Sequence, residues 1–271
     1  MKKWPFLAIT AASMFLTVKP ISSTAQPLHY TVANTHSHND YEQAAPFWAA
    51  WQQRFGSIEA DIWLVGGKVL IGHDTTEIKT GRTLEDYYVK PLLACIGKNH
   101  GYPYADTTRR LQILIDVKAD SVATLAAMIA LLDKYPALEH CPALTWVISG
   151  NRPDPSQYNS YPPFIAFDGI LHRQYTPAEL SRIAMMSDDL RHYTRWDSRT
   201  GIPSDSLDGL RIATGLDSLR LAIQRSHALH LPVRLWDAPD FPAAWRQLME
   251  LKVDYLNTDH IADLAAYLNS L

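Results

Sequence analysis

Short apolar runs typical of β-strands recur along the 271 residues, and stretches with apolar residues at helical spacing lie between most of them. Such alternation is typical of βα units, whose strands form a parallel sheet. The predicted strands cover residues 30–36, 57–64, 68–73, 111–117, 144–149, 164–168, 232–236 and 254–258. The predicted helices cover residues 44–54, 121–134, 177–186, 208–229, 241–251 and 260–270, and we expect their apolar stripes to pack in the core.

The length of the chain favours one domain after a leader segment. Residues 26–271 are close to the roughly 250 residues of a typical eight-stranded α/β barrel. We find no internal repeat, low-complexity tract or Gly/Ser linker that would divide them. We therefore predict an α/β fold, a (β/α)8 TIM barrel, with its active site at the C-terminal ends of the strands.

Residues 1–25 have the pattern of a secretory signal peptide. They begin with Lys2 and Lys3, continue through an apolar stretch and end in small residues at Ala25. The alternative is an uncleaved anchor, but the apolar stretch is short for a membrane span of about 20 residues. We expect cleavage, no stable membrane anchor and a secreted or periplasmic protein.

Charge and cysteine content restrict the partners. Without the three lysines of residues 1–25, the chain carries 22 basic and 28 acidic residues, a formal charge of −6. This excess argues against nucleic acid as a partner, although a phosphate ester could still bind at a metal ion. Cys95 and Cys141 could form a disulfide in an oxidising compartment or remain buried thiols, and the sequence leaves both open.

Three acidic residues lie within predicted strands. Glu59 and Asp61 are two residues apart, so their side chains point to one face of the strand. Asp116 interrupts an almost continuous apolar run, where a buried charge needs a partner such as a metal ion or Lys118. Carboxylate oxygens are suitable ligands for Mg²⁺ or Ca²⁺. The sequence therefore predicts that Glu59, Asp61 and Asp116 hold one divalent cation.

Histidines end two of the predicted strands. His36 and His38 are spaced two apart at the end of the first, and His73 ends the third, beside Asp74, which could orient its ring. Imidazole has an unperturbed pKa of about 6.5, which suits proton transfer near neutral pH. We predict that His36 acts as general base and His73 as general acid, while Lys118 neutralises charge on the phosphate oxygens.

These residues together resemble the superfamily of phosphatidylinositol-specific phospholipase C and glycerophosphodiester phosphodiesterase. The shared pattern is a first histidine, a Glu-x-Asp pair, a His-Asp pair and an acid-x-Lys strand. The opening His36-Ser-His-Asn-Asp-Tyr41 is most similar to that of a secreted bacterial branch, which resembles the proteins named altered inheritance of mitochondria protein 6. The similarity extends over nearly all of residues 26–271, through segments 83–88, 91–93, 147–153, 167–169 and 254–259.

This resemblance implies a TIM barrel that cleaves phosphodiesters with a divalent metal. In related enzymes the attacking group is often a hydroxyl of the substrate, so hydrolase and lyase outcomes are both open. His38, Asn39 and Trp236 are then expected to contact the substrate. Two features differ from glycerophosphodiesterases: Arg-Gly does not follow the first histidine, and the tetrapeptide Pro-Glu-Asn-Thr is missing. The spacing of His36 and Asn39, and Asp rather than Glu at 116, are more similar to the phospholipase D members.

We therefore predict a secreted, metal-dependent phosphoric diester hydrolase or lyase for a phospholipid-like or glycerophosphodiester-like substrate. One alternative is a barrel hydrolase of the amidohydrolase or polymerase-and-histidinol-phosphatase type, with His36 and His38 as ligands of transition metals. That scheme needs further histidines, such as His172 and His260, and leaves the Glu-x-Asp pair unused. A second alternative is a barrel that binds a sugar or lipid without turnover.

One long segment interrupts the βα pattern. Residues 74–110 are rich in aromatic side chains, and loops of this length in compact domains are commonly functional or disordered. Because aromatic residues favour order, we expect this segment to form a lid that shapes the substrate site. We expect the same of the Pro- and Tyr-rich residues 151–163.

Overall fold

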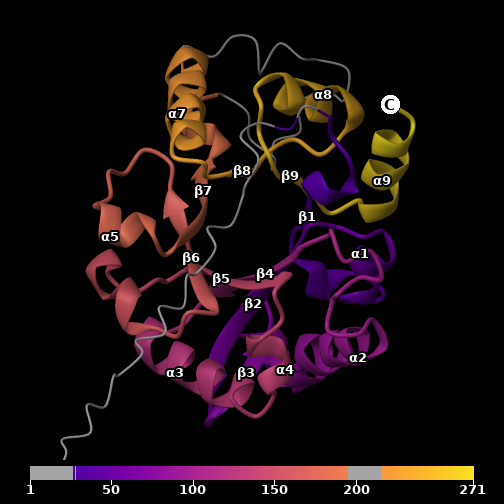
Figure 1. Ribbon diagram of the computed structural model, residues 1–271, viewed down its shortest axis with the longest axis vertical. Coiled ribbons are helices and arrows are strands. Elements are labelled where there is room, and N and C mark those ends of the chain that lie inside the picture. The colour runs from indigo at the N-terminus through magenta and orange to yellow at the C-terminus, as the bar shows by residue number, and fades with distance from the viewer. Residues whose placement is uncertain (1–26, 28, 195–214) are drawn as a thin grey trace, which may run out of the picture.

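Eight parallel strands form the wall of a nearly closed barrel, and helices lie around its outside (Figure 1). The computed structural model describes residues 27, 29–194 and 215–271. The predicted signal peptide and the first seven residues of the predicted helix 208–229 lie outside the described residues. The wall strands are β1 (Thr35–Ser37), β2 (Ser57–Val65), β4 (Leu111–Val117), β5 (Leu144–Gly150), β6 (Ile165–Ile170), β7 (Ile183–Asp189), β8 (Val233–Trp236) and β9 (Leu256–Thr258).

The strands follow the order β8-β7-β6-β5-β4-β2-β1-β9 around the barrel. Between the two end strands the hydrogen bonding is sparse. The carbonyl oxygen of Val233 accepts bonds from the amides of Asp254 and Tyr255, and a single bridge joins Arg234 to Tyr255. The predicted TIM barrel is therefore confirmed, with a loosely bonded seam between β8 and β9.

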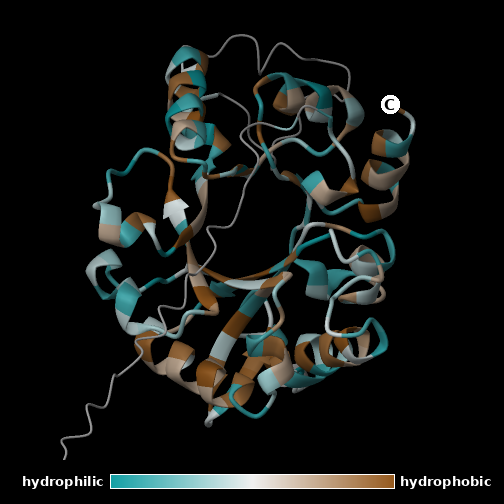
Figure 2. Cartoon of the chain, viewed as in Figure 1, coloured by the Kyte–Doolittle hydropathy of each residue, from teal (hydrophilic) through white to brown (hydrophobic). Residues whose placement is uncertain are grey.

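Helices cover the outside of this wall with their apolar faces. On α3, for example, Leu125, Met128 and Leu132 are completely buried. Figure 2 shows that hydrophobic colours also predominate on wall strands such as β2 and β4, as expected for a sheet covered on both faces. The α-helices are α1 (Trp48–Gln52), α2 (Lys90–Lys98), α3 (Ser121–Leu132), α4 (Pro136–Glu139), α5 (Pro177–Leu180), α7 (Leu216–Ala228), α8 (Pro242–Glu250) and α9 (Ile261–Asn269).

Short helical turns complete the described part of the chain. They are 3-10 turns at Val32–Asn34, Asp40–Glu42, Glu77–Thr80, Pro155–Ser160 and Leu190–His192, and a π-helical turn at Glu85–Val89. Within the described residues, none of the helices has both the length and the apolar character required to cross a bilayer.

The predicted strand 68–73 is not part of the barrel wall. β3 (Lys68–Ile71) pairs antiparallel with the end of β2, across a turn at Gly66 and Gly67. Both glycines have positive φ, which suits a two-residue hairpin, whereas parallel strands need a longer crossover. The hairpin brings His73 back beside Asp61 in β2.

The eighth wall strand is β7, which the sequence does not predict. The sequence instead predicts a helix over residues 177–186. The helix α5 ends at Leu180, and Ile183–Asp189 pairs with both β6 and β8. Alanine and methionine at 184–186 favour helices by intrinsic propensity. Burial overrides that preference, because parallel strands covered on both faces have near-continuous apolar sequences.

The first wall strand is shorter than predicted. The hydroxyl of Thr31 accepts a bond from the amide of Ala33, and the Asn34 side chain accepts one from the amide of Thr31, which stabilises a 3-10 turn in place of a strand. β1 then covers only 35–37, and the next residue, His38, donates its amide to the carbonyl of Thr258, the last residue of β9.

The structure also answers the questions that the sequence left open about the cysteines and the long segment. Cys95 and Cys141 are both buried free thiols, which decides between the two alternatives. Residues 74–110 are ordered and include α2. Part of this segment packs beside α1, since Trp51 donates to the carbonyl of Pro103 and Tyr104 donates to the carbonyl of Phe55.

Candidate functional site

A cavity of about 560 Å³ opens at the C-terminal ends of the wall strands, where the barrel fold predicts a site. Of the nine residues predicted for the site, seven line it. They come from four wall strands (β1, β2, β4 and β8) or the loops that follow them, and from the loop after β3: His38, Asn39, Glu59, His73, Asp116, Lys118 and Trp236. The remaining two, His36 and Asp61, are completely buried beneath its surface.

The three predicted metal ligands come together. Glu59 and Asp61 project from one face of β2, and the register of the parallel sheet places Asp116 of β4 directly beside Asp61. A carboxylate oxygen from each lies within 4.8 Å of the other two. The sequence pattern therefore correctly predicts this juxtaposition.

Two oxygens of this group have no partner among the described residues. Asp61 Oδ2 accepts bonds from Tyr41 (2.8 Å) and His73 Nδ1 (3.1 Å), and Lys118 Nζ lies 3.0 Å away. Asp61 Oδ1 and Asp116 Oδ1, however, are buried and unpaired. Buried polar atoms nearly always have partners, so these two oxygens require one.

The electrostatics of the acidic group also fit a cation. Burial and the nearby charges of Glu59 and Asp116 raise the pKa of Asp61 to about 7. Lys118, which lies 2.8 Å from Asp116, offsets only part of this negative charge. An all-oxygen donor set with two unsatisfied atoms fits Mg²⁺ or Ca²⁺.

A glycine makes room for the Asp116 carboxylate. Gly150, at the end of β5, has a φ of +67°, and a β-carbon at this position would lie 1.8 Å from Asp116 Oδ1. Side chains are disfavoured at this φ, and here one would also occupy the space of a ligand atom. The loop after β5 therefore depends on glycine to hold the acidic group in place.

His36 occupies a different place from the one that its predicted role requires. Its side chain is 0% exposed, and its two ring nitrogens contact Ser57 Oγ and Glu59 Oε2, each at 2.6 Å. Burial and the nearby charge of Arg234 lower the pKa of His36 to about 4. Because the ring is enclosed and both nitrogens are engaged, the structure does not place His36 where it could contact a substrate, and its role as general base stays a prediction.

Two other histidines face the cavity, each with one ring nitrogen held by an acid. His38 Nδ1 lies 2.8 Å from Asp259, and His73 Nδ1 lies 3.1 Å from Asp61. No partner is found for either Nε2 among the described residues. Burial alone would lower the pKa of His38, but the hydrogen bond to Asp259 and the charge of Glu59 outweigh it and raise the pKa. Both rings are thus oriented for proton transfer.

A buried arginine lies at the base of the cavity. Arg234 Nη2 is 3.4 Å from Glu59 Oε2, whereas its Nε and Nη1 are buried without a partner in the described part of the chain. The sequence analysis missed Arg234. The sequence does contain a feature that could have identified it: a basic residue within the apolar run 232–236, where a buried charge needs a partner.

Asn39 and Trp236 both line the cavity, although contact with a substrate stays a prediction. Asn39 is held in a left-handed conformation (φ 43°), and its side-chain oxygen lies 3.0 Å from the Tyr41 hydroxyl oxygen. Trp236 is partly exposed, with the Arg191 guanidinium 5.8 Å from its ring centroid.

The expected lid does not cover this cavity. The lining includes none of the described side chains from 74–110, and Arg152 alone from 151–163. The hydrolase alternative based on His36 and His38 also lacks support, because neither belongs to a metal-competent group among the described residues.

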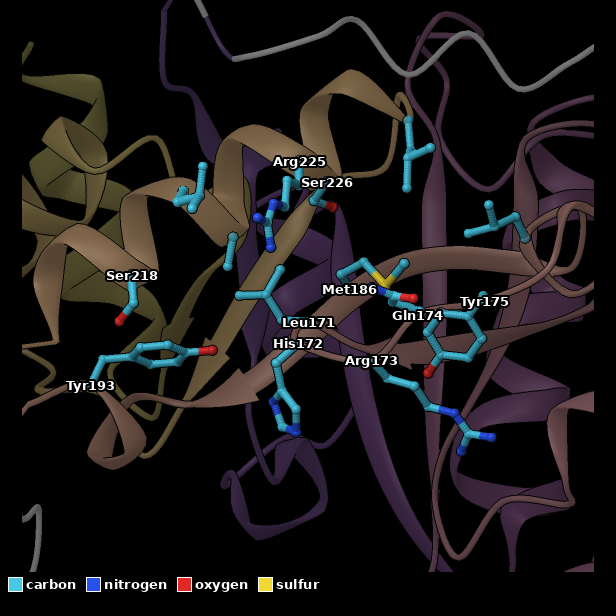
Figure 3. Close-up of a pocket in the computed structure, with 14 residues that line it drawn as sticks. Leu171, His172, Arg173, Gln174, Tyr175, Met186, Tyr193, Ser218, Arg225 and Ser226 are labelled. Carbon is cyan, nitrogen blue, oxygen red and sulfur yellow. The ribbon is translucent and has the colours of Figure 1, made fainter.

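A second cavity of similar size, about 560 Å³, lies between the loop after β6 and helix α7 (Figure 3). It is lined mainly by apolar side chains such as Leu171 and Met186, with Arg225 and Ser226 contributed by α7. His172 lines both cavities.

Sequence comparison finds two matching families. Residues 27–140 match the AIM6-like phosphodiesterase domain, and residues 232–262 match the glycerophosphoryl diester phosphodiesterase family. Among the similar proteins, Altered inheritance of mitochondria protein 6 of Kluyveromyces lactis is 25% identical, over 87% of this chain and 72% of that protein. The homolog of the same name in Arthroderma benhamiae is 22% identical, over 95% of this chain and 98% of its own.

The fold also matches a solved structure. A glycerophosphodiester phosphodiesterase from Parabacteroides distasonis superposes with a TM-score of 0.53, over 87% of this chain and 96% of that chain. At 11% sequence identity, this likeness supports the barrel fold alone.

Proposed function

Because the chain belongs to the PLC-like phosphodiesterase superfamily, a group of phosphoric diester hydrolases, we propose that its cavity cleaves phosphodiesters with one Mg²⁺ or Ca²⁺ held by Glu59, Asp61 and Asp116. One observation carries this proposal. Three carboxylates converge at the mouth of the barrel, and two of their buried oxygens have no partner in the described residues. When bound, such a cation supplies positive charge that stabilises the phosphate oxygens in the transition state.

The protein side chains supply the rest of the reaction. Lys118 and Arg234 line the cavity and present positive charge to the phosphate. His38, whose pKa is raised, gives a proton to the leaving oxygen, and His73 accepts one from the attacking hydroxyl. This assignment replaces His36 with His38 and exchanges the role first given to His73.

The hydroxyl that attacks comes from water or from the substrate, which gives a hydrolase or a lyase. A phospholipid-like or glycerophosphodiester-like substrate fits the family matches, and the partly exposed Trp236 offers its ring for contact with the substrate. Export directed by residues 1–25 is also part of the proposal, and N-terminal sequencing of protein recovered from outside the cytoplasm tests it.

Activity measurements after metal removal test this function. Chelated protein should not cleave bis-p-nitrophenyl phosphate or glycerophosphodiesters, and Mg²⁺ or Ca²⁺ should restore cleavage. His38→Ala and His73→Ala should each lower kcat by about 10²–10⁴-fold. Asp61→Asn should abolish binding of Mg²⁺ or Ca²⁺, whereas His140→Ala, at an exposed site away from the cavity, serves as control.

Two results would contradict the proposal at different points. If no phosphodiester is cleaved with any divalent cation, the function itself is wrong. If diesters are cleaved but both histidine variants keep near-normal rates, only the proton-transfer assignment is wrong.

A further inference from the structure

A second group of metal-binding side chains lines the same cavity, on strands separated from the acidic group by β5. His172 follows β6, Asp188 lies near the end of β7, and His192 lies in the turn after β7. His172 Nδ1 is 2.7 Å from Asp188 Oδ2, and His192 Nδ1 is 2.8 Å from Asp188 Oδ1. One ligand atom from each lies within 4.8 Å of the others.

The central carboxylate of this group is fixed by its surroundings. Asp188 is only 4% exposed, and it accepts a bond of 2.7 Å from the Tyr193 hydroxyl and one of 2.9 Å from the amide of Asp189. The two imidazoles, in contrast, are 62% and 58% exposed, and their ring planes are 79° apart. A rigid acid is thus flanked by two rings that can adjust to an ion.

We propose that His172, Asp188 and His192 form a binding site for a transition metal ion such as Zn²⁺. Two imidazole nitrogens and one carboxylate are the donor set of zinc sites that keep an open position, and Mg²⁺ or Ca²⁺ would instead prefer the oxygens of Glu59, Asp61 and Asp116. Bonds of about 2.0–2.1 Å to zinc place tetrahedral ligands about 3.3 Å apart. The two contacts to Asp188 therefore need to lengthen by only about half an ångström.

The position of this site gives it a role in ligand binding. All three ligands line the cavity that also holds Lys118 and Arg234, so the open coordination positions of the ion face the space available to a substrate. An ion there would bind an anionic oxygen, such as one of a phosphate group. The site itself requires only ion binding and does not depend on the proposed phosphodiesterase activity.

Cobalt titration tests the site directly. Tag-free protein is chelated, saturated with Mg²⁺ and titrated with Co²⁺, whose visible absorption reports nitrogen and oxygen ligation. One Co²⁺ should bind and be displaced by Zn²⁺. His172→Ala and His192→Ala should each weaken Co²⁺ binding by at least about tenfold. His140→Ala and Asp61→Asn should leave it unchanged.

Three results would overturn the proposal: no Co²⁺ bound in the presence of Mg²⁺, unchanged affinity in both histidine variants, or loss of binding in Asp61→Asn. Circular dichroism checks that each variant is folded. If the histidine variants do not fold, anomalous diffraction from zinc-soaked crystals of the unaltered protein decides the matter. An ion between His172 and His192 supports the site, and an ion at the acidic group alone refutes it.

Discussion

At residue 150, the space that a β-carbon would fill is already occupied by the carboxylate of Asp116. We expect Gly150→Ala to displace this carboxylate and to lower affinity for Mg²⁺ or Ca²⁺ by at least about tenfold, in addition to a backbone cost of about 1 kcal/mol. Gly81→Ala is the matched control, because its φ of +72° is similar and no atom lies within 4 Å of the added carbon.

Isothermal titration with Mg²⁺ and with Ca²⁺ measures the loss of affinity, and urea unfolding measures the loss of stability. Both variants should lose similar stability, but only Gly150→Ala should lose affinity. Equal affinities in the two variants would show that Asp116 does not need this space to bind the ion.

Single residues also show how far sequence reasoning extends. Period-two spacing correctly placed Glu59 and Asp61 on one face, because that rule follows from strand geometry alone. It could not separate His36 from His38, which share a face and differ only in depth. Depth depends on where β1 ends and on its partner Thr258, more than 200 residues away.

At the scale of elements, the errors in prediction arose from tertiary context. β7 was missed because alanine and methionine favour helices, and burial between β6 and β8 outweighed that preference. This single error also hid Asp188 and its neighbours from the list of candidate residues. β4, which carries Asp116, was easier to predict, since its apolar run is interrupted by charge only near the C-terminal end.

The seam between β8 and β9 depends on one buried side chain. Asp254 Oδ2 accepts bonds of 2.7 Å from the amide of Val233 and from His227 Nε2, which links α7 to both sides of the seam. Asp254→Ala should lower the free energy of unfolding by about 3 kcal/mol, since it leaves two buried donors without a charged acceptor. Asp254→Asn should cost less, because its carbonyl oxygen can still accept one bond.

Urea unfolding of both variants tests whether Asp254→Ala loses more stability than Asp254→Asn. If the Ala variant is as stable as the wild type, the seam is held by other contacts. If Asn costs as much as Ala, the negative charge and not the geometry of the acceptor is the essential feature.

For the whole molecule, the buried His36 should make stability depend on pH. Its folded-state pKa of about 4 lies below the ordinary value of 6.5, so the unfolded chain binds a proton at higher pH than the folded barrel does. His36 makes its full contribution to the free energy of unfolding above pH 6.5, and this contribution is lost as the pH falls toward 4. From the size of the shift, the loss is about 3 kcal/mol.

Denaturant unfolding between pH 4 and 7 tests this dependence. His36→Asn should be less stable than the wild type at pH 7, but its stability should fall less steeply toward pH 4. Parallel curves for the two proteins would mean that His36 is not responsible for the slope.

The sheet order has a consequence for how the protein is made. β1 lies between β2 and β9, and His38 depends on Asp259, 221 residues further along the chain. During synthesis the first strand therefore emerges long before one of its two neighbours. Domains gain their structure as the chain emerges, and distant contacts form slowly. His38, the proposed proton donor, should therefore gain its acidic partner only when the last strand joins the sheet. A ribosome-bound chain that lacks β9 would carry the acidic group but remain inactive.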